Sequence, residues 1–528
     1  MEARRLKAHS PRAALLLAFG LLGAYLFTRA WVAEDAYISF RVVDNALMGY
    51  GLRWNIYERV QAYTHPLWLL LHLPLQALWG NIFHVTMALS FACSLAAIAV
   101  MLAALRAPPL LMLGALLVPF AASKTLVDYS SSGLENPLSM LLFSCFCFLL
   151  LRLSQHRHFW FFLSLSVTLA LFNRLDMALL YAPAMALLLW PMRQHLPLKP
   201  LLLGALPLLA WFAFALFYYG FALPNTRYAK LGTDLPLSQY LEQGFRYFNY
   251  LLTLDLAGAL LLLSSFLFLL APRLLHVPSL PHARLPQAIA LGIYLYSLYV
   301  LAIGGDYMAG RFWSLPVFAA LCLWAIWATK RRRPDFAFLL SVVALGAMLA
   351  TPLIGKLNDA CGKCIPLGGR VTNAYVTFRM NRLFTEDWRI RYAPEYRFVK
   401  RGREIAAMQP PPLRALRYIG LIGYYAGPQA KLIDTLGLAD PLLARLPASR
   451  QQNFYIGHFR RDIPGGYPHA LQTGSLNQMS APLADYYEKL RLITAGDLWN
   501  SERLKTILLF NLGAYEPLKQ QYLDARTR

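Results

Sequence analysis

Long apolar runs recur through the first two thirds of this 528-residue chain. Runs of roughly 15–22 residues extend from Ala13 to about Ile354 and alternate with short polar loops. A helix of about 20 apolar residues crosses a hydrocarbon core of about 30 Å. The composition agrees with this interpretation, because 58% of the residues are hydrophobic and only 15% are charged. We therefore expect a polytopic α-helical membrane protein with a soluble C-terminal domain, and not a series of soluble domains.

The runs predict about eleven transmembrane helices within residues 1–354. The first span is expected at 13–32 as an uncleaved anchor, since its apolar stretch is long for a signal peptide and no clear cleavage site precedes Glu34. Residues 66–79 are too few to cross comfortably, so they predict an interfacial or re-entrant helix. The other spans are expected near 83–105, 108–123, 137–153, 159–173, 177–192, 200–222, 251–271, 286–303, 311–328 and 335–354.

Charged residues at the ends of these runs predict the orientation of the chain. With the amino terminus in the cytoplasm, basic clusters such as residues 330–333 fall inside, as the positive-inside rule requires. The same choice places the acidic residues of the alternate loops outside. We therefore expect these acidic loops on the outer face of the membrane.

The remaining residues, 355–528, contain no apolar run long enough to span a membrane. A helical pattern at 413–421 and a strand pattern at 431–436 predict a mixed α/β domain on the outer face. This region holds 25 basic and 14 acidic residues, within a net charge of +23 for the chain. No helix-turn-helix, zinc-finger or RNA-binding motif accompanies that charge, so it suits anionic lipids or acidic glycans, and no nucleic-acid partner is expected.

Cys361 and Cys364 form a C-x-x-C pair at the start of the outer domain. A zinc ribbon needs a second such pair, and a thioredoxin-like site needs a surrounding βαβ unit, and neither is found. In an oxidising compartment the pair predicts a short structural disulfide. The other four cysteines lie inside apolar spans, where they are expected to pack as small hydrophobic residues.

Polar residues gather where the predicted outer loops meet the spans. The first loop, 33–65, begins with the adjacent carboxylates Glu34 and Asp35. Four later loops contribute further polar residues, and by topology they converge on the same face. Charged groups at a membrane edge are costly unless they are paired or hydrated, so they mark candidate functional sites. A hydrated helix end with an Arg–Glu tether is the structural alternative.

A shared cleft of such groups would suit glycosyl transfer from a lipid phosphate. A carboxylate can take the proton of an incoming hydroxyl as general base, and Arg and Lys can stabilise charge on the departing phosphate. Nucleotide-driven transport and zinc hydrolysis are poorly supported, because the chain has no phosphate-loop, dinucleotide-binding or H-E-x-x-H motif.

Two other function classes stay open. One is a flippase or other transporter of lipid-linked sugars, whose polar groups should lie near the bilayer midplane and not at span ends on one side. The other is a glycan polymerase, a ligase or a protein O-glycosyltransferase that uses a lipid-diphosphate oligosaccharide. Only analysis of donor and product would separate the latter from a monosaccharide transferase.

Seven short motifs resemble the GT-C family of polyprenyl-phosphate-dependent glycosyltransferases, in particular bacterial arabinofuranosyltransferases that act on cell-wall glycan or pilin. They lie at 34–41, 58–68, 132–135, 223–230, 304–312, 433–445 and 457–458. The resemblance implies a transmembrane GT-C domain over 1–354 with a catalytic first outer loop at 33–65, and a periplasmic domain over 355–528. It also implies a bacterial inner-membrane protein whose active site faces the periplasm.

The resemblance implies roles for individual residues. Such families carry an Asp-Asp pair in the first loop, which maps onto Glu34-Asp35, so Asp35 is the expected base and Glu34 its helper or an acceptor ligand. The expected ligands of the donor phosphate and sugar are Arg41, Arg59, His65, Arg174, Asn225, Arg227, Tyr228, Lys230 and Arg311. The expected acceptor or sugar ligands are Glu135, Asp176, Asp306 and His458.

The implied substrates are a polyprenyl-phosphate sugar, expected to carry D-arabinofuranose, and a hydroxyl of a glycan or protein acceptor. No cofactor is required for this chemistry. The paired carboxylates could nevertheless hold Ca²⁺ or Mg²⁺, which prefer oxygen ligands.

Overall fold

The computed structural model describes residues 2–231, 233, 235–277, 282–360, 371–449 and 455–527, without the side chains of 2–10, 354–360 and 527. The chain divides into two compact units that are discontinuous in sequence. The first unit comprises Met1–Ala33, Phe83–Leu208 and Pro236–Ala393, and the second comprises Glu34–Ile82, Leu209–Leu235 and Pro394–Arg528. The predicted domain boundary at 354 lies inside the first unit and stays a prediction. The predicted disulfide of Cys361 and Cys364 lies outside the described residues.

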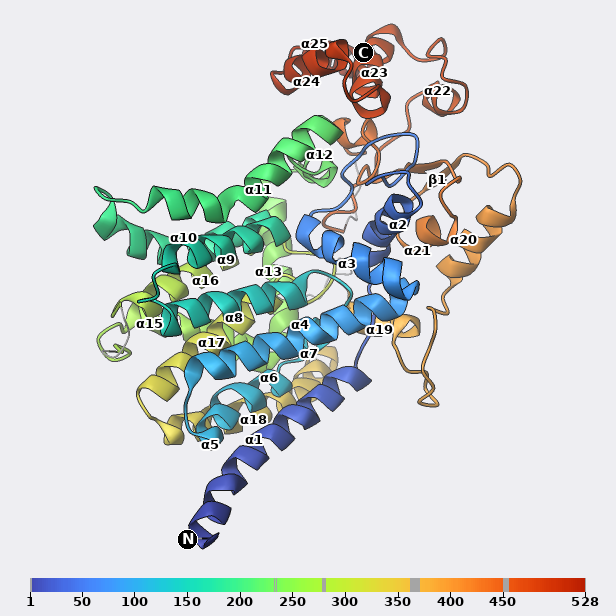
Figure 1. Cartoon of the computed structure of the whole chain (residues 1–528). Helices are drawn as coiled ribbons and strands as arrows, with labels where there is room; N and C mark the ends of the chain where they lie inside the picture. Colours follow the sequence, from blue (N-terminus) through green and yellow to red (C-terminus); the bar gives the residue numbers. More distant parts are fainter. Residues whose placement is uncertain are drawn as a thin grey trace. The chain divides into compact units, whose positions relative to one another are not determined.

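Apolar helices form the first unit, because Leu and Ala lose little side-chain freedom in a helix. Helix α17 (Ser314–Lys330) is buried from Ser314 to Thr329 and is therefore the centre of this unit. In Figure 1, α8 packs against α9, and α10 packs against α16. The other elements are α1 (Glu2–Thr28), α4 (Ile82–Leu105), α5 (Pro109–Met112), η1 (Leu113–Leu117), α6 (Val118–Ala122), α7 (Lys124–Asp128), α8 (Asn136–Arg152), α9 (Phe159–Asn173), η2 (Leu175–Met177), α10 (Ala178–Leu189), η3 (Trp190–Met192), α13 (Leu237–Leu254), α14 (Leu256–Ser265), α15 (Leu267–Leu270), α16 (Leu285–Ala302), α18 (Pro334–Ala360), α19 (Ala374–Thr377) and η4 (Arg379–Asn381). Helix α11 (Leu198–Tyr219) belongs to the first unit up to Leu208 and to the second from Leu209.

Six helices of the described residues are long and apolar enough to cross a membrane. They are Pro11–Thr28, Ile82–Leu105, Leu175–Met192, Leu198–Tyr219, Leu285–Ala302 and Pro334–Leu353. Four shorter apolar helices have 10–17 residues, and the longest of them reaches only about 26 Å at 1.5 Å per residue. A polytopic helical protein is thus supported, whereas the count of eleven spans stays a prediction.

Helices α14 and α15 cover most of the span expected near 251–271, but the chain bends by 118° between α13 and this segment. Asp255 lies at the bend and is buried, with a carboxylate that accepts hydrogen bonds from the Gly258 N–H at 2.9 Å and the Thr125 N–H at 2.8 Å. The Ser123 hydroxyl donates a third bond to it at 2.6 Å. A buried carboxylate needs these donors, so Asp255 ends one helix and caps the next.

The second unit is also mainly helical. Its two strands, β1 (Arg414–Leu416) and β2 (Leu432–Asp434), pair in parallel with Ala415 opposite Ile433, and they are the only strands of the described residues. Its helices are α2 (Ala36–Leu47), α3 (Pro66–Trp79), α12 (Asn225–Leu231), α20 (Arg397–Ala407), α21 (Leu421–Tyr425), η5 (Leu443–Arg445), α22 (Tyr467–Thr473), α23 (Ala481–Ala495), α24 (Ser501–Asn511) and α25 (Glu516–Thr527).

The strand expected at 431–436 is confirmed by β2, but the helix expected at 413–421 is wrong. That stretch contains β1, and the helix begins only at Leu421. Strand β1 bonds to chain far along the sequence, where Arg414 donates to the Lys431 carbonyl at 3.0 Å and Thr435 donates to the Leu416 carbonyl at 3.0 Å. Local helical periodicity cannot report such a pairing.

Candidate active site

Five carboxylates of the second unit lie close enough to interact electrostatically: Glu34, Asp35, Glu58, Asp434 and Asp440, called here the carboxylate cluster. Glu34 interacts with Asp35 and Asp434, and Asp440 interacts with Asp434 and Glu58. The exposed fraction is 5% for Glu34 and 0% for Asp434, whereas Asp35 is half-buried. Asp35 is therefore the most accessible member of the cluster.

The acidic pair lies at the start of α2, a helix inside the stretch predicted as a polar loop. Asp35 occupies the N-cap position of α2, and Glu34 Oε1 accepts a hydrogen bond from the Leu421 N–H at 3.0 Å. Gly420 permits this close packing, because a Cβ there would lie 2.2 Å from the Glu34 carbonyl oxygen. The amphipathic sequence of α2 buries most of its side chains and so fixes the pair's position.

Burial raises the pKa values of four of these carboxylates, because the charged form loses hydration. Burial, and then the charge of Asp35, raise the pKa of Glu34 to about 8. Burial likewise raises the pKa of Asp434 to about 6 and that of Asp440 to about 7. It also raises the pKa of Glu58, with a further contribution from Asp440. At neutral pH Glu34 therefore stays mainly protonated, whereas Asp434 is mainly ionised.

Asp434 and Asp440 organise the loop that follows β2. Asp434 accepts bonds from the backbone N–H groups of Leu436 at 2.9 Å and Ala439 at 2.8 Å. Asp440 accepts from the N–H of Leu443 at 2.8 Å and from the hydroxyl of Tyr467 at 3.0 Å. These bonds satisfy buried backbone donors, so both residues contribute to the fold as well as to the electrostatics.

Two predicted phosphate ligands, Arg41 and Arg59, bond to backbone carbonyls. The buried Arg41 guanidinium donates to the carbonyls of Trp54 at 2.7 Å, Gly423 and Ala430 at 3.2 Å. Arg59 donates to the carbonyls of Tyr218 at 3.1 Å and Ile493 at 3.3 Å, among others. Phosphate binding would require these bonds to break, so the geometry gives both residues a structural role.

Helix α12 carries four of the predicted ligands. Asn225 is buried, and its Nδ2 donates to the carbonyls of Gly437 at 2.8 Å and Asp440 at 3.1 Å, so it anchors the helix. Arg227 and Lys230 are exposed, and their i, i+3 spacing places them on one side of α12. These two cations are therefore accessible to an anion.

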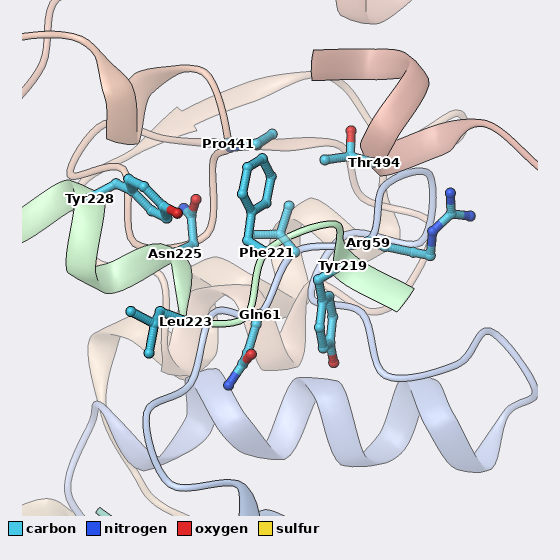
Figure 2. Close-up of a pocket in the computed structure, with 10 residues that line it drawn as sticks. Arg59, Gln61, Tyr219, Phe221, Leu223, Asn225, Tyr228, Pro441 and Thr494 are labelled. Carbon is cyan, nitrogen blue, oxygen red and sulfur yellow. The ribbon is translucent and has the colours of Figure 1, made fainter. Parts of the chain in front are cut away.

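Figure 2 shows a pocket in the second unit, with Asn225 and Tyr228 at one end and Arg59 at the other. The other lining residues are Val60, Gln61, Tyr219, Phe221, Leu223, Pro441 and Thr494. The pocket volume of about 10 Å³ has room for one water molecule and not for a sugar. These three residues thus line one small pocket, which does not open into a substrate-sized cavity.

The two predicted histidines differ in their surroundings. His65 is buried, and its Nε2 lies 2.8 Å from the Ser39 hydroxyl. His458 is half-buried and follows Gly457, where a Cβ would lie 3.3 Å from Lys230 Nζ. The chain around His458 therefore lies beside the cationic side of α12.

The first unit collects the other five predicted residues into one buried chain of ion pairs, called here the ion network: Asp176, Arg174, Glu135, Arg311 and Asp306. Arg174 pairs with Asp176 and with Glu135 at 2.5 Å, and Arg311 pairs with Glu135 at 3.3 Å and Asp306 at 3.1 Å. Glu135 and Arg174 lie at ends of α8 and α9, Asp176 lies in η2, and Asp306 and Arg311 lie in the loop between α16 and α17. Three carboxylates and two guanidinium groups leave a formal charge of −1.

Glycines shape the loop that supplies Asp306 and Arg311 to the ion network. Gly305 has a φ of +71°, and a Cβ there would lie 2.3 Å from the ring of Tyr247. The Tyr247 hydroxyl donates to the Met308 carbonyl at 3.0 Å and accepts from the Phe312 N–H at 3.0 Å. The tight turn after α16 therefore needs glycine, which explains the Gly-Gly-Asp motif.

Sequence reasoning did not single out several charged groups that shape these sites. Glu58 lies in the matched motif at 58–68 but was given no role, and Arg461 is 1% exposed with bonds to the carbonyls of Phe459 at 2.6 Å and Leu436 at 3.1 Å. Asp434 and Asp440 belong to a motif that the resemblance had matched. No group of three or more His, Cys, Asp or Glu side chains among the described residues could hold a metal ion.

Two curated proteins are similar to this chain, and both are named terminal β-(1→2)-arabinofuranosyltransferase. The protein from Corynebacterium glutamicum is 30% identical over 338 residues, which cover 56% of this chain and 48% of that protein. The protein from Mycobacterium tuberculosis is 28% identical over 337 residues, which cover 57% of this chain and 53% of that protein. The chain spans about half the length of these relatives.

No family profile and no solved structure matches the chain. The similarity to two proteins of the same name agrees with the resemblance carried by the short motifs. We conclude that this chain is distantly related to arabinofuranosyltransferases.

Proposed function

We propose that this protein transfers an arabinofuranosyl residue from a polyprenyl phosphate to a hydroxyl of a glycan or protein acceptor. The proposal rests on one observation above all, the accessible Asp35 beside the buried Glu34 in a chain related to arabinofuranosyltransferases. We place the reaction at the periplasmic face of a bacterial inner membrane, in agreement with the charge pattern of the loops.

Asp35 is the general base of the proposed reaction. It takes the proton of the acceptor hydroxyl while that oxygen forms a bond to the anomeric carbon of the donor sugar. The bond between the anomeric carbon and the phosphate oxygen breaks, and polyprenyl phosphate departs with the electron pair. The proton thus passes to Asp35 and the negative charge to the departing phosphate.

Glu34 assists by staying neutral. Its raised pKa of about 8 keeps it protonated at neutral pH, so Glu34 itself carries no negative charge. Asp35 is the member of the pair that a substrate can reach. Two ionised carboxylates side by side would also repel the phosphate of the donor.

Cations must neutralise the departing phosphate, and we assign this role to Arg227 and Lys230. Both are exposed on α12, whereas Arg41 and Arg59 are buried. The ion network of the first unit has a formal charge of −1, which suits sugar hydroxyls better than phosphate. We therefore assign Glu135, Asp176 and Asp306 to sugar or acceptor binding, with Arg174 and Arg311 holding their carboxylates in place.

The test is a transfer assay with purified protein in detergent, a defined polyprenyl-phosphoryl arabinofuranose and an arabinan oligosaccharide, read by mass analysis. Asp35→Asn should lower transfer about 10²–10⁴-fold, the usual contribution of a general base. Glu34→Gln should keep transfer, because Gln resembles the neutral acid. Asp485→Asn, an exposed carboxylate of α23, is the matched control.

Retained transfer by Asp35→Asn would contradict the assigned base. Turnover in detergent, where no second compartment exists, would exclude a pure flippase, and consumption of only lipid-diphosphate oligosaccharides would favour a polymerase or ligase. The step as written needs no metal. Loss of transfer on chelation would show instead that Ca²⁺ or Mg²⁺ takes part.

A further inference from the structure

The C-terminal helices of the second unit expose an apolar stripe made of Trp499, Leu504, Leu508 and Leu512. Their exposed fractions are 78%, 40%, 61% and 73%. The three leucines are spaced by four residues in and directly after α24 (Ser501–Asn511), so they line one side of that helix. Trp499 immediately precedes the helix cap at Asn500.

These exposed apolar side chains lie together in one patch. Among the described residues after 394, the only other large hydrophobic side chains that are exposed are Met408 and Tyr418. Single exposed hydrophobic residues are ordinary, whereas a contiguous apolar patch marks an interaction surface. The stripe therefore needs a covering partner of apolar character.

Hydrogen bonds within the second unit hold α24 at the end of α11. Arg503 donates to the carbonyls of Phe217 at 2.8 Å and Tyr218 at 3.0 Å, and Asn511 donates to the Gly220 carbonyl at 2.8 Å. Figure 1 shows α24 above the end of α11, the helix drawn in green.

Two packing contacts strengthen the contact of the C-terminal helices with the end of α11. The rings of Trp499 and Phe217 pack with centroids 4.8 Å apart. Gly220 lets the chain approach α23, because a Cβ there would lie 2.1 Å from Ile493 Cγ2. The stripe is thus held rigidly to the last turns of α11.

The position of α11 identifies the partner. Its residues Leu198–Tyr219 form a candidate membrane span, and Leu209 and Leu216, in the part of α11 that belongs to the second unit, are 50% and 42% exposed. An apolar surface that continues from a membrane span onto α24 lies where the hydrocarbon core ends. Trp is enriched at that depth, and the exposed Lys505 beside Leu504 suits anionic headgroups.

We propose that α24 is an interfacial membrane contact, whose stripe enters the headgroup region of the bilayer and seats the C-terminal helices on its outer surface. The occupant is lipid, and neither a second copy of the chain nor another protein. This role is independent of the reaction that the enzyme is proposed to catalyse.

The test attaches an environment-sensitive fluorophore to Leu508→Cys in the full-length protein, reconstituted in nanodiscs with anionic lipid. The background carries Cys361→Ser and Cys364→Ser, and labelling of this parent measures any signal from the remaining cysteines. Glu502→Cys is the matched control, because it is exposed on the same helix and about 120° away from Leu508.

The probe at position 508 should be quenched by lipids that carry a nitroxide near the headgroup, and it should be several-fold less accessible to aqueous iodide than the probe at 502. Equal access of iodide to both positions would overturn the proposal. Protection from iodide without quenching by the labelled lipid would also overturn it, since a protein would then cover the stripe.

Discussion

Replacing Glu34 by Gln is expected to stabilise the second unit above pH 7 and to flatten the dependence of its stability on pH. Burial and the charge of Asp35 raise the pKa of Glu34 from 4.5 to about 8. Between pH 4.5 and pH 8 the unfolded chain loses the Glu34 proton while the native state keeps it, so the free energy of unfolding falls over this range. The contribution of protonated Glu34 to stability is complete below pH 4.5 and is lost as the pH rises through 8. At about 1.36 kcal/mol per pKa unit, the loss is at most about 5 kcal/mol.

The substitution isolates this effect because Gln resembles the protonated acid in shape and stays neutral. Its amide oxygen can still accept the bond from the Leu421 N–H. Asp434 and Asp440 also have raised pKa values, so the variant should keep a smaller decline of stability with pH.

The assay is thermal unfolding of the detergent-purified protein between pH 5 and pH 9, followed by the fluorescence of its 12 tryptophans. A unit of about 200 residues changes Tm by about 2–4 °C per kcal/mol, so the two proteins should diverge by up to about 10–20 °C at the alkaline end. Glu488→Gln, an exposed carboxylate of α23, should retain the wild-type profile. Parallel profiles for Glu34→Gln and the wild type would show that Glu34 is ionised in the native state and would refute the reasoning.

Three further variants test other parts of the structure. Arg461→Leu should lower Tm strongly, since each buried carbonyl left without its donor costs about 1–3 kcal/mol, whereas Arg460→Leu at the exposed neighbouring position should leave Tm near the wild-type value. Gly305→Ala should destabilise the first unit by at least about 1–3 kcal/mol, because alanine would adopt a φ of +71° against the ring of Tyr247; an unchanged Tm would contradict the geometry of that loop. Arg227→Ala combined with Lys230→Ala should raise the KM for the polyprenyl-phosphate donor at least tenfold with an unchanged melting profile, and an unaltered KM would remove α12 from the donor site.

Much of the helical architecture follows from short stretches of sequence. The apolar runs placed α3 at Pro66–Trp79 and α9 at Phe159–Asn173, since a run of such residues favours helix whatever surrounds it. The pairing of β1 with β2 and the bend at Asp255 were not predicted. Both depend on hydrogen-bond partners that lie far away along the chain.

The candidate site also has features that the sequence predicted and features that only the structure shows. The motif around Glu34 and Asp35 and the charges of the outer loops identified residues that the structure gathers into a carboxylate cluster and an ion network. The sequence could not show that Arg41 bonds to backbone carbonyls while Arg227 stays exposed, because both are arginines at the edge of an apolar run.

Residue type and spacing by themselves therefore determined the helical class, most helix positions and the polar groups from which a site could be built, since helix formation and membrane compatibility depend on neighbours a few residues apart. The tertiary structure alone decided which carboxylates are buried and protonated, which guanidinium groups donate hydrogen bonds to backbone carbonyls, and which side of α24 is exposed. Those properties depend on hydration and on partners that only the folded chain brings within a few ångströms of each other.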